Sequence, residues 1–312
     1  MLEFFAASDV ENGGIYRLGF DGNEIKTLGF APCERPAYIA VNGGLLHVLF
    51  RAPYKDSDSS GVVTFDSELK RVSGIIPTGG PIAAHLCVHG RKIYVANYIS
   101  GDTTILGGKS VHHAGHGPHP TRQLSSHPHM VTPTPDGKYL AVCDLGCDRI
   151  HILSPELEIV SETVMPSGCG PRHIVFSPDG TYAYCANELS STVTSLAYNG
   201  GKLTLIGSYS TVPEGVPDSF PAAIRFDRGQ VLVSNRGHDS IAVFDADGGK
   251  LSFSEYIDTH GHYPRDFAVS GGYIVTANER SDNIVLLGRG GEYISEIGIK
   301  RPLCVLIKSL SS

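Results

Sequence analysis

The sequence predicts an all-β fold made of repeated, short antiparallel strands. Three observations lead to this prediction. Strands of alternating apolar residues follow one another between glycine- and proline-rich turns, one strand opening recurs at similar intervals, and each end of the chain resembles half of a repeat. No segment keeps the i, i+3, i+4, i+7 apolar spacing of an amphipathic helix over three turns. The fold is therefore expected to consist of the repeats.

The stretch from Gly170 to Tyr198 shows the repeat most clearly. Its first strand has alternating apolar residues and leads into a Ser-Pro-Asp-Gly turn, in which proline presets φ and glycine accepts a positive φ. A second strand begins at Thr181 and ends at the polar pair Asn187 and Glu188. A third strand includes Val193, so one repeat supplies several antiparallel strands in succession.

A proline opens a similar apolar strand at seven places along the chain. Roughly 38 to 50 residues separate successive openings, a period typical of four-stranded propeller blades. The openings are Pro36, Pro81, Pro128, Pro171, Pro221, Pro264 and Pro302. After the first six, a turn leads to second strands that begin at Leu45, Lys92, Lys138, Thr181, Gln230 and Tyr273. We therefore expect a seven-bladed β-propeller of four-stranded blades that forms a single domain over residues 1–312.

The seventh opening has no second strand because the sequence ends soon after it. The first residues, Leu2 to Asp9, look like a second strand that has no first strand before it. We expect the C-terminal strand from Arg301 to Leu306 to pair with this N-terminal strand and to become the innermost strand of the first blade. Such pairing would close the ring and remove two exposed sheet edges.

Composition and charge exclude several classes of partner. The net charge is −7 and no basic run is present, so we expect no nucleic-acid partner. The apolar runs are much shorter than a bilayer requires, and the N-terminus lacks the basic flank of a signal peptide. Seven cysteines without a C-x-x-C pair suit a reducing compartment, so we expect a cytoplasmic protein. The oligomeric state is open, and a monomer is compatible with the sequence.

Two groups of residues resemble metal ligands. Six histidines lie between Val111 and Met130, but they are scattered over a glycine- and proline-rich loop without a nearby acid. Zinc ligands, in contrast, usually sit close together on a rigid element. Cys143 and Cys147 are four residues apart, and we interpret them as buried free thiols rather than as a metal or redox pair. We therefore expect no metal site and no cofactor.

In a propeller blade, the first strand runs away from one face and the second strand returns to it. Residues that begin a first strand and residues that follow a second strand therefore meet at one mouth of the central channel. Most of the unusual polar residues belong to these classes: His127, His129, Arg172, His173, Arg265 and Asp266 in the first, and Asn97, Asp144, Asn187, Glu188, Asn235, Arg236, Asn278 and Glu279 in the second. This convergence predicts a polar site at the mouth.

Two arginines at this mouth, Arg172 and Arg236, suit a carboxylate or a phosphate, because a guanidinium group binds such anions through two parallel hydrogen bonds. The alternative is that they pair with Glu188, Asp266 or Glu279 and only hold loops in place. No nucleophile elbow, phosphate-binding loop or H-E-x-x-H motif is present. An enzyme with this sequence is therefore expected to activate water or to shuttle protons without a covalent intermediate.

Four segments in register, 127–150, 170–193, 235–244 and 263–287, resemble the seven-bladed lactonase family. That family includes the propeller-type 6-phosphogluconolactonases and the fungal carboxy-cis,cis-muconate cyclases. The likeness implies a metal-independent site at one end of the channel. The residues to which it assigns catalytic roles are His129, Arg172, Glu188 and Arg236. Further candidates for substrate binding are His85, Asn97, His127, His173, His238, Arg265 and Asp266.

The resemblance implies hydrolysis of a sugar-acid lactone, an anionic small molecule held by Arg172 and Arg236 while His129 or Glu188 activates water. Two other functions stay open at this point. A muconate-type cycloisomerase would use the same arginines for two carboxylates, and a non-catalytic propeller would serve as a binding platform. A six-bladed, calcium-dependent lactonase disagrees with the seven strand openings.

Overall fold

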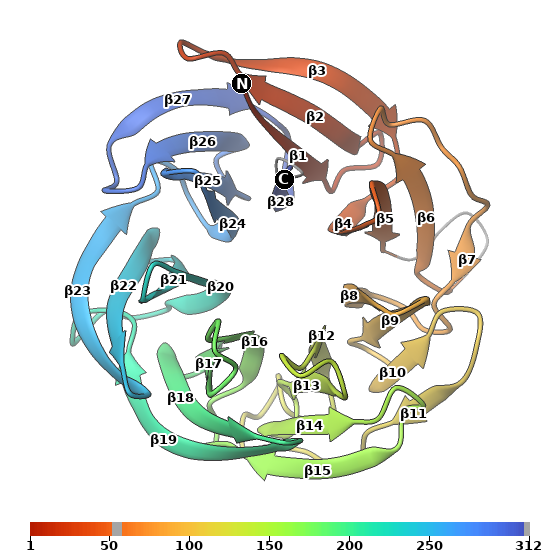
Figure 1. Ribbon diagram of the computed structural model, residues 1–312, viewed down its shortest axis with the longest axis vertical. Coiled ribbons are helices and arrows are strands. Elements are labelled where there is room, and N and C mark those ends of the chain that lie inside the picture. The colour runs from red at the N-terminus through yellow and green to blue at the C-terminus, as the bar shows by residue number, and fades with distance from the viewer. Residues whose placement is uncertain (52–57, 309–312) are drawn as a thin grey trace.

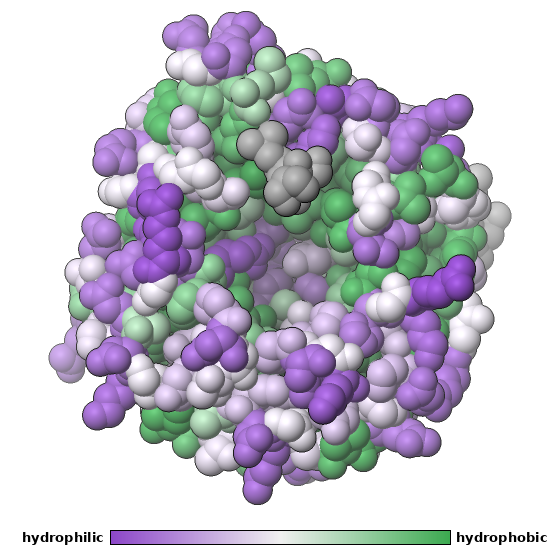
Figure 2. Space-filling model, viewed as in Figure 1, coloured by the Kyte–Doolittle hydropathy of each residue, from purple (hydrophilic) through white to green (hydrophobic). Residues whose placement is uncertain are grey.

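The computed structural model describes residues 1–51 and 58–308, and within them it forms seven four-stranded antiparallel sheets arranged as a ring (Figure 1). The predicted seven-bladed propeller is therefore confirmed. The described part of the chain contains no helix that is long and apolar enough to cross a membrane. Figure 2 shows that the centre of the ring is hollowed and that hydrophilic side chains line the hollow.

We number the blades from the one that contains both ends of the chain, and list the strands of each blade from the channel outward. Blade 1 contains β28 (Pro302–Ile307), β1 (Leu2–Ser8), β2 (Gly14–Phe20) and β3 (Ile25–Pro32); blade 2 contains β4 (Pro36–Asn42), β5 (Leu45–Phe50), β6 (Gly61–Asp66) and β7 (Ile76–Pro77). Blade 3 contains β8 (Ala83–His89), β9 (Lys92–Asn97), β10 (Asp102–Ile105) and β11 (Ser110–His112); blade 4 contains β12 (Pro128–Pro133), β13 (Leu140–Asp144), β14 (Arg149–Leu153) and β15 (Ile159–Val164).

The remaining three blades follow the same order along the chain. Blade 5 contains β16 (Pro171–Phe176), β17 (Tyr182–Asn187), β18 (Thr192–Asn199) and β19 (Lys202–Ser210). Blade 6 contains β20 (Phe220–Asp227), β21 (Gln230–Arg236), β22 (Ser240–Asp247) and β23 (Lys250–Asp258). Blade 7 contains β24 (Pro264–Ser270), β25 (Tyr273–Asn278), β26 (Asn283–Gly288) and β27 (Tyr293–Gly298).

Some strand boundaries differ from the predicted ones by one or two residues. Blade 3 begins at Ala83 rather than at Pro81, because Ile82 has a positive φ of 48° and stands outside the extended strand. The second strand of blade 4 begins at Leu140 rather than at Lys138, since the preceding turn is longer than predicted.

The C-terminal strand closes the ring as predicted. β28 is the innermost strand of blade 1 and pairs with β1, in a register that runs from Phe4 opposite Ile307 to Ser8 opposite Pro302. Its side chains alternate between the two neighbouring blades. Cys304 packs into the apolar cluster shared with blade 2, whereas Val305 packs into the cluster shared with blade 7. The last strand therefore contributes to the core on both sides of its blade.

The described residues form seven apolar clusters, each between two neighbouring blades. This arrangement follows from strand geometry, because successive side chains of a strand point to opposite faces of its sheet. Each blade therefore packs one set of apolar residues against the preceding blade and the other set against the next.

Each innermost strand carries a register irregularity close to its first residue. In blade 5, Pro171 lies opposite Asn187 and His173 lies opposite Ala186, so Arg172 has no pairing partner on β17. The corresponding extra residues from blade 1 to blade 7 are Leu303, Ala37, Ala84, His129, Arg172, Ala222 and Arg265. A bulge of this kind bends the strand and redirects the extra side chain.

Ring closure predicts a strong dependence of stability on β28. Deleting residues from Arg301 onward is expected to lower Tm steeply, because it exposes β1 as a sheet edge and empties part of two apolar clusters. The point variant Val305→Ala is expected to cost about 2 kcal/mol of unfolding free energy. Urea unfolding followed by circular dichroism measures both effects.

Lys300→Ala is the matched control for Val305→Ala, because the Lys300 side chain is 77% exposed. We expect this control to change the unfolding free energy by no more than about 0.5 kcal/mol. A truncated chain that melts at the same temperature as the intact protein would contradict closure by β28.

Candidate active site

A pocket of about 310 Å³ lies at the end of the central channel where the innermost strands begin. Its lining residues are Arg51, Ile82, Ala83, Ala84, Tyr98, Arg122, His129, Glu188, Phe220, Arg236, Tyr263 and Arg265. The residues that begin a first strand and those that follow a second strand therefore do meet at one mouth. The volume is at the lower end of the range for small-molecule sites.

Rigid backbone positions present the polar side chains of this pocket. His129 and Arg265 occupy the bulge positions of β12 and β24, and Arg172, which lines a smaller neighbouring space, occupies the bulge position of β16. Glu188 directly follows β17, and Arg236 is the last residue of β21. Because sheet pairing holds the backbone on both sides of these positions, the side chains need little ordering to act together.

Glu188 is the centre of one group of charges. Its Oε1 lies 2.6 Å from Nη2 of Arg122, and its Oε2 lies 2.8 Å from Nη2 of Arg236 and 3.1 Å from Nε of Arg172. The glutamate is only 3% exposed. A buried carboxylate requires such partners, because an unpaired charge in the protein interior is strongly destabilising.

The electrostatics of this group keep Glu188 ionised. Burial by itself would raise the pKa of Glu188, but the charges of Arg236, Arg172 and Arg122 outweigh burial and hold the pKa well below its usual range. A carboxylate with such a low pKa accepts a proton poorly. We conclude that Glu188 is better suited to orient guanidinium groups than to act as a base.

Three buried imidazoles lie at the bottom of the pocket and below it. The ring centroids of His129 and His173 are 5.4 Å apart, and those of His173 and His85 are 5.6 Å apart. Burial, together with the charge of Arg172, lowers the pKa of His129 and of His173 well below the ordinary value. Burial also lowers the pKa of His85 to about 3, helped by Arg225. All three are therefore neutral at physiological pH.

The channel is nearly closed beneath the pocket. Arg172 and His173 line a second space of only about 10 Å³, which shares Arg51, Ala84 and Arg265 with the lining of the larger pocket. This volume holds about one water molecule.

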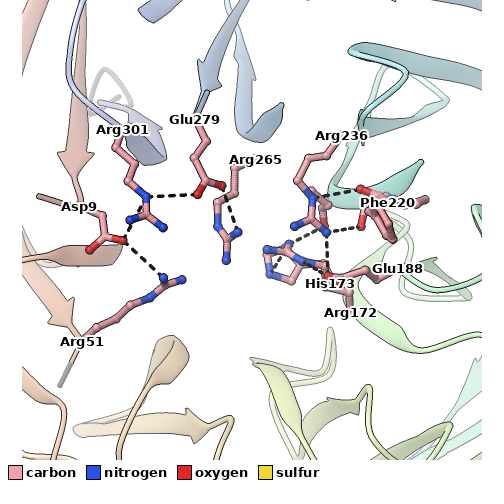
Figure 3. A network of polar contacts seen from close by, with 12 residues as sticks. Asp9, Arg51, Arg172, His173, Glu188, Phe220, Arg236, Arg265, Glu279 and Arg301 are labelled. Carbon is pink, nitrogen blue, oxygen red and sulfur yellow. Dashed lines mark hydrogen bonds and ion pairs between the residues drawn. The ribbon is translucent and has the colours of Figure 1, made fainter. Parts of the chain in front are cut away.

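A second group of charges faces the first across the mouth (Figure 3). Asp9 lies 3.4 Å from Arg51 and 3.7 Å from Arg301, while Glu279 lies 3.2 Å from Arg265 and 3.3 Å from Arg301. Together with the Glu188 group, the described residues place six guanidinium groups here: Arg51, Arg122, Arg172, Arg236, Arg265 and Arg301. The three carboxylates are those of Asp9, Glu188 and Glu279, so positive charge is in excess at this mouth.

The structure brings together most of the residues that the sequence singles out. Arg172, Glu188 and Arg236 are joined by ion pairs, His129 lines the same pocket as Glu188 and Arg236, and Arg265 lies on the facing wall. Their catalytic roles stay a prediction. Sequence reasoning missed Arg51, Arg122 and Asp9. Asp9 and Arg51 directly follow the second strands of blades 1 and 2, as Glu188 does in blade 5, so repeat alignment could have found them.

The other predicted substrate-binding residues lie outside the pocket lining. The fully buried amide of Asn97 donates to the Thr78 carbonyl and to Thr104. The carboxylate of Asp266 accepts hydrogen bonds from Arg225 and from the backbone of Val305. These bonds hold the fold together, and they leave little capacity for a ligand.

His127 and His238 also take other positions. The ring of His127 stacks on Tyr98, with centroids 4.5 Å apart, and His127 therefore supports a residue of the pocket wall. His238 lies in a separate, open groove of about 660 Å³, together with Asp239, His260 and His262. No described residue is shared between this groove and the pocket that His129 lines.

One group among the described residues brings metal-ligand atoms close together. Asp144, Cys147 and His151 place such atoms within 4.8 Å of one another, and all three are buried. Asp144 already accepts hydrogen bonds from the Ser126 hydroxyl and from the His127 and Gly146 backbone amides. None of the three lines the pocket, so this group has no part in the arrangement around Glu188.

The fold and the mouth of the channel define a seven-bladed propeller with an arginine-rich pocket at one end of its central channel. The family described as "Lactonase, 7-bladed beta-propeller" matches residues 5–305, and the chain belongs to this family. A 6-phosphogluconolactonase from Bacillus subtilis (strain 168) is 32% identical over 335 residues, which cover 94% of this chain and 93% of that protein.

Solved structures show the same architecture over the whole chain. A protein from Lactobacillus plantarum has a TM-score of 0.89 at 29% identity and covers 99% of this chain and 100% of its own. A periplasmic gluconolactonase from Pseudomonas aeruginosa has a TM-score of 0.90 at 25% identity and covers 99% of both chains.

Buried neutral histidines predict that the protein loses stability in mild acid. Four of them, His85, His113, His129 and His173, have folded-state pKa values far below 6.5. Below about pH 6.5 the unfolded chain therefore binds more protons than the folded protein, and the unfolding free energy falls as the pH falls. Each histidine contributes up to about 1.4 kcal/mol per pH unit.

Urea unfolding at several values between about pH 7.5 and about pH 5 tests this expectation. Within that window His85→Phe should flatten the slope by up to about 1.4 kcal/mol per pH unit, because it removes one of the groups. His116→Gln, which replaces an exposed histidine, is the control. A pH-independent unfolding free energy over this range would refute the prediction.

Proposed function

We propose that the protein hydrolyses a sugar-acid lactone at the arginine-lined mouth, without a metal ion. The observation that carries the proposal is the contact group itself: a neutral imidazole, His129, borders the same pocket as an ionised glutamate whose three arginine partners hold it in place. Membership of the lactonase family and the likeness to a 6-phosphogluconolactonase support the reaction class.

In this proposal His129 acts as the general base. A water molecule donates a hydrogen bond to the imidazole and attacks the lactone carbonyl carbon, while its proton passes to His129. The carbonyl oxygen becomes an oxyanion, which Arg236 stabilises from the pocket wall. A well-placed donor to such an oxyanion is typically worth about 2.7–4 kcal/mol. The intermediate then breaks its ring C–O bond, and the imidazolium returns the proton to the leaving oxygen.

Glu188 has a supporting role in this scheme. Its oxygens already face three guanidinium groups, and these charges hold its pKa well below the usual range, so it accepts a proton poorly. The carboxylate fixes Arg236 and Arg172 in one orientation before the substrate arrives. Such preorganisation is the main source of electrostatic catalysis, because no dipole has to rotate during the reaction.

A muconate-type cycloisomerase is the second candidate, and one observation favours it. Arginines stand on both walls of the pocket, so two carboxylates of one substrate would each find a partner. The same His129 would then move a proton to or from carbon. A non-catalytic platform is less consistent with the site, since that role does not require a buried, charged group around a small-molecule pocket.

The cellular compartment follows from the cysteines rather than from the site. All seven cysteines are free thiols, and six of them are buried. We propose a reducing, cytoplasmic location, in which such thiols stay reduced.

Replacing His129 tests the catalytic assignment. His129→Ala is expected to lower kcat/KM for lactone hydrolysis by about 100- to 10,000-fold, because the base is lost. Spectrophotometric assays with a pH indicator measure the released acid. Circular dichroism should show an intact β-sheet spectrum, since a substitution to alanine keeps the bulge backbone.

His127→Gln is the comparison variant, because His127 lies two residues away and outside the pocket lining. We expect it to lose much less kcat/KM than His129→Ala. Wild-type-like turnover of His129→Ala would remove this residue from the mechanism.

A substrate panel in the presence of EDTA tests the reaction class. Aldonolactones, phosphorylated aldonolactones and muconolactones should be assayed side by side. We expect hydrolysis of sugar-acid lactones and unchanged rates after metal chelation. Conversion of muconolactones alone would favour the cycloisomerase, whereas loss of activity with EDTA and recovery on adding a divalent cation would contradict a metal-independent mechanism.

A further inference from the structure

The arginines of the Glu188 group are held in place by several partners within the protein. Nη1 of Arg172 donates to the Ala222 carbonyl at 2.6 Å and lies 3.1 Å from Nε2 of His173, and Nε of Arg172 lies 3.1 Å from Glu188. Arg236 donates from Nε to the Phe220 carbonyl at 3.0 Å and contacts Glu188 through Nη2. These contacts tie both guanidinium groups to Glu188 and to the backbone of β20, so neither is free to turn towards the far end of a substrate.

The arginines of the facing wall have fewer partners. Among the described residues, the guanidinium group of Arg51 makes one polar contact, 3.4 Å from Nη1 to Asp9, and its buried Nε has no hydrogen-bond partner there. The guanidinium group of Arg265 likewise makes one polar contact within that part of the chain, 3.2 Å from Nη1 to Glu279. A guanidinium group offers five N–H donors, so the described residues engage only one donor nitrogen of each.

Both groups point into the same space. Figure 3 shows Arg51 and Arg265 directed from one side of the mouth into the gap that Glu188 and Arg236 border on the other side. All four residues line the one pocket. The side chains of Arg51 and Arg265 are only 21% and 18% exposed, so bulk water screens them incompletely.

Two like charges that line one pocket favour an anion between them. Burial and the charge of Arg265 lower the pKa of Arg51 to about 10, although Asp9 opposes the shift. Burial raises the pKa of Asp9, although the neighbouring arginines oppose the shift. Around this wall Arg51, Arg265 and Arg301 share the two carboxylates of Asp9 and Glu279, so positive charge is in excess here.

We propose that Arg51 and Arg265 form an anion subsite that binds a compact oxyanion, a phosphate or a carboxylate, carried by the substrate at the end remote from its lactone carbonyl. Each guanidinium group can bind such a group through two parallel hydrogen bonds. The subsite makes the enzyme selective for lactones with this second charged end over neutral lactones of the same ring. It rests on the proposed lactone hydrolysis for its substrate, but its binding chemistry can be tested separately.

The position of the subsite is built into the fold. Arg265 occupies the bulge of β24, as His129 occupies the bulge of β12, and Arg51 follows β5 as Glu188 follows β17. The subsite and the reacting residues are therefore presented by equivalent backbone positions of different blades. The positions of their Cα atoms are therefore set mainly by the ring.

Three lactones with a related skeleton test the selectivity: glucono-δ-lactone, 6-phosphoglucono-δ-lactone and a glucarolactone, whose far end carries a carboxylate. The wild type is expected to prefer at least one of the charged lactones by kcat/KM. Arg51→Gln and Arg265→Gln should each lower kcat/KM for that charged lactone by about 10- to 100-fold and reduce its preference over glucono-δ-lactone. Preference for the phosphate or for the carboxylate identifies the anion.

Two further variants keep the test interpretable. Arg91→Gln replaces an exposed arginine in the turn between β8 and β9, outside the pocket, and should retain the wild-type preference. Arg51→Lys keeps a positive charge beside Asp9 but loses the forked guanidinium group. It therefore separates a loss of selectivity from a loss of folding. Melting temperatures of all variants are recorded alongside the kinetics, and Arg51→Lys is expected to lose preference while melting like the wild type.

The possible outcomes separate the subsite from the reaction. Hydrolysis by the wild type with unchanged preference in both Gln variants, or with no preference for a charged lactone, overturns the subsite and leaves lactone hydrolysis standing. If no lactone is hydrolysed, the proposed function fails. Calorimetric titration with inorganic phosphate and 6-phosphogluconate then decides the subsite: affinity that falls at least about tenfold in Arg51→Gln and Arg265→Gln supports it, and equal affinity or no binding overturns it.

Discussion

Seven innermost strands start at one rim of the ring, and a bulge near the first residue of each strand is the constraint on which the site depends. In a regular strand the side chains alternate between the two faces of the sheet, and here both faces pack against neighbouring blades. The bulge releases one side chain per blade from this alternation. Blades 2, 3 and 6 place alanine there, as Ala37, Ala84 and Ala222, which leaves room at the mouth. Blades 4, 5 and 7 place histidine or arginine there, so the repeat supplies the positions and the side chains supply the chemistry.

The charges at the mouth have the opposite sign to those of the molecule as a whole. The chain carries a net charge of −7, yet guanidinium groups outnumber carboxylates around the pocket. A positive cleft in an acidic protein attracts small anions and repels other copies of the same surface. Burial strengthens this field, because the charges of Glu188 and its partners are poorly screened by water. An arrangement that served only to hold loops together would need no such excess.

The fold could be predicted from the sequence because its signals are periodic. Proline openings, turn residues and two complementary half-repeats fix the number of blades and their closure, and the structure agrees.

For the site, the repeat pattern predicted only that polar residues gather at one mouth of the channel. Asn97, Asn187 and Asn278 end second strands and Asn235 is the last residue but one of another, but their amides donate to neighbouring threonine, serine or backbone groups. The residue that follows the asparagine, or the bulge residue, faces the pocket instead. Composition alone cannot reveal that the pocket residue lies one position beyond the asparagine. Arg122 was beyond prediction, since it reaches Glu188 from a long loop that follows no repeat.

The excess positive charge also determines how strong a base His129 can be. After burial, Arg172 is the largest of the charges that depress the pKa of His129, and Arg265 on the facing wall is another. A depressed pKa keeps the imidazole neutral but makes it a weak proton acceptor. An oxyanion bound between Arg51 and Arg265 would offset part of that field and raise the basicity of His129 in the complex. The remote end of the substrate would then contribute to the chemical step as well as to binding. Selectivity for a charged lactone would appear in kcat as well as in KM, which is the use of remote binding interactions expected of an enzyme complementary to its transition state.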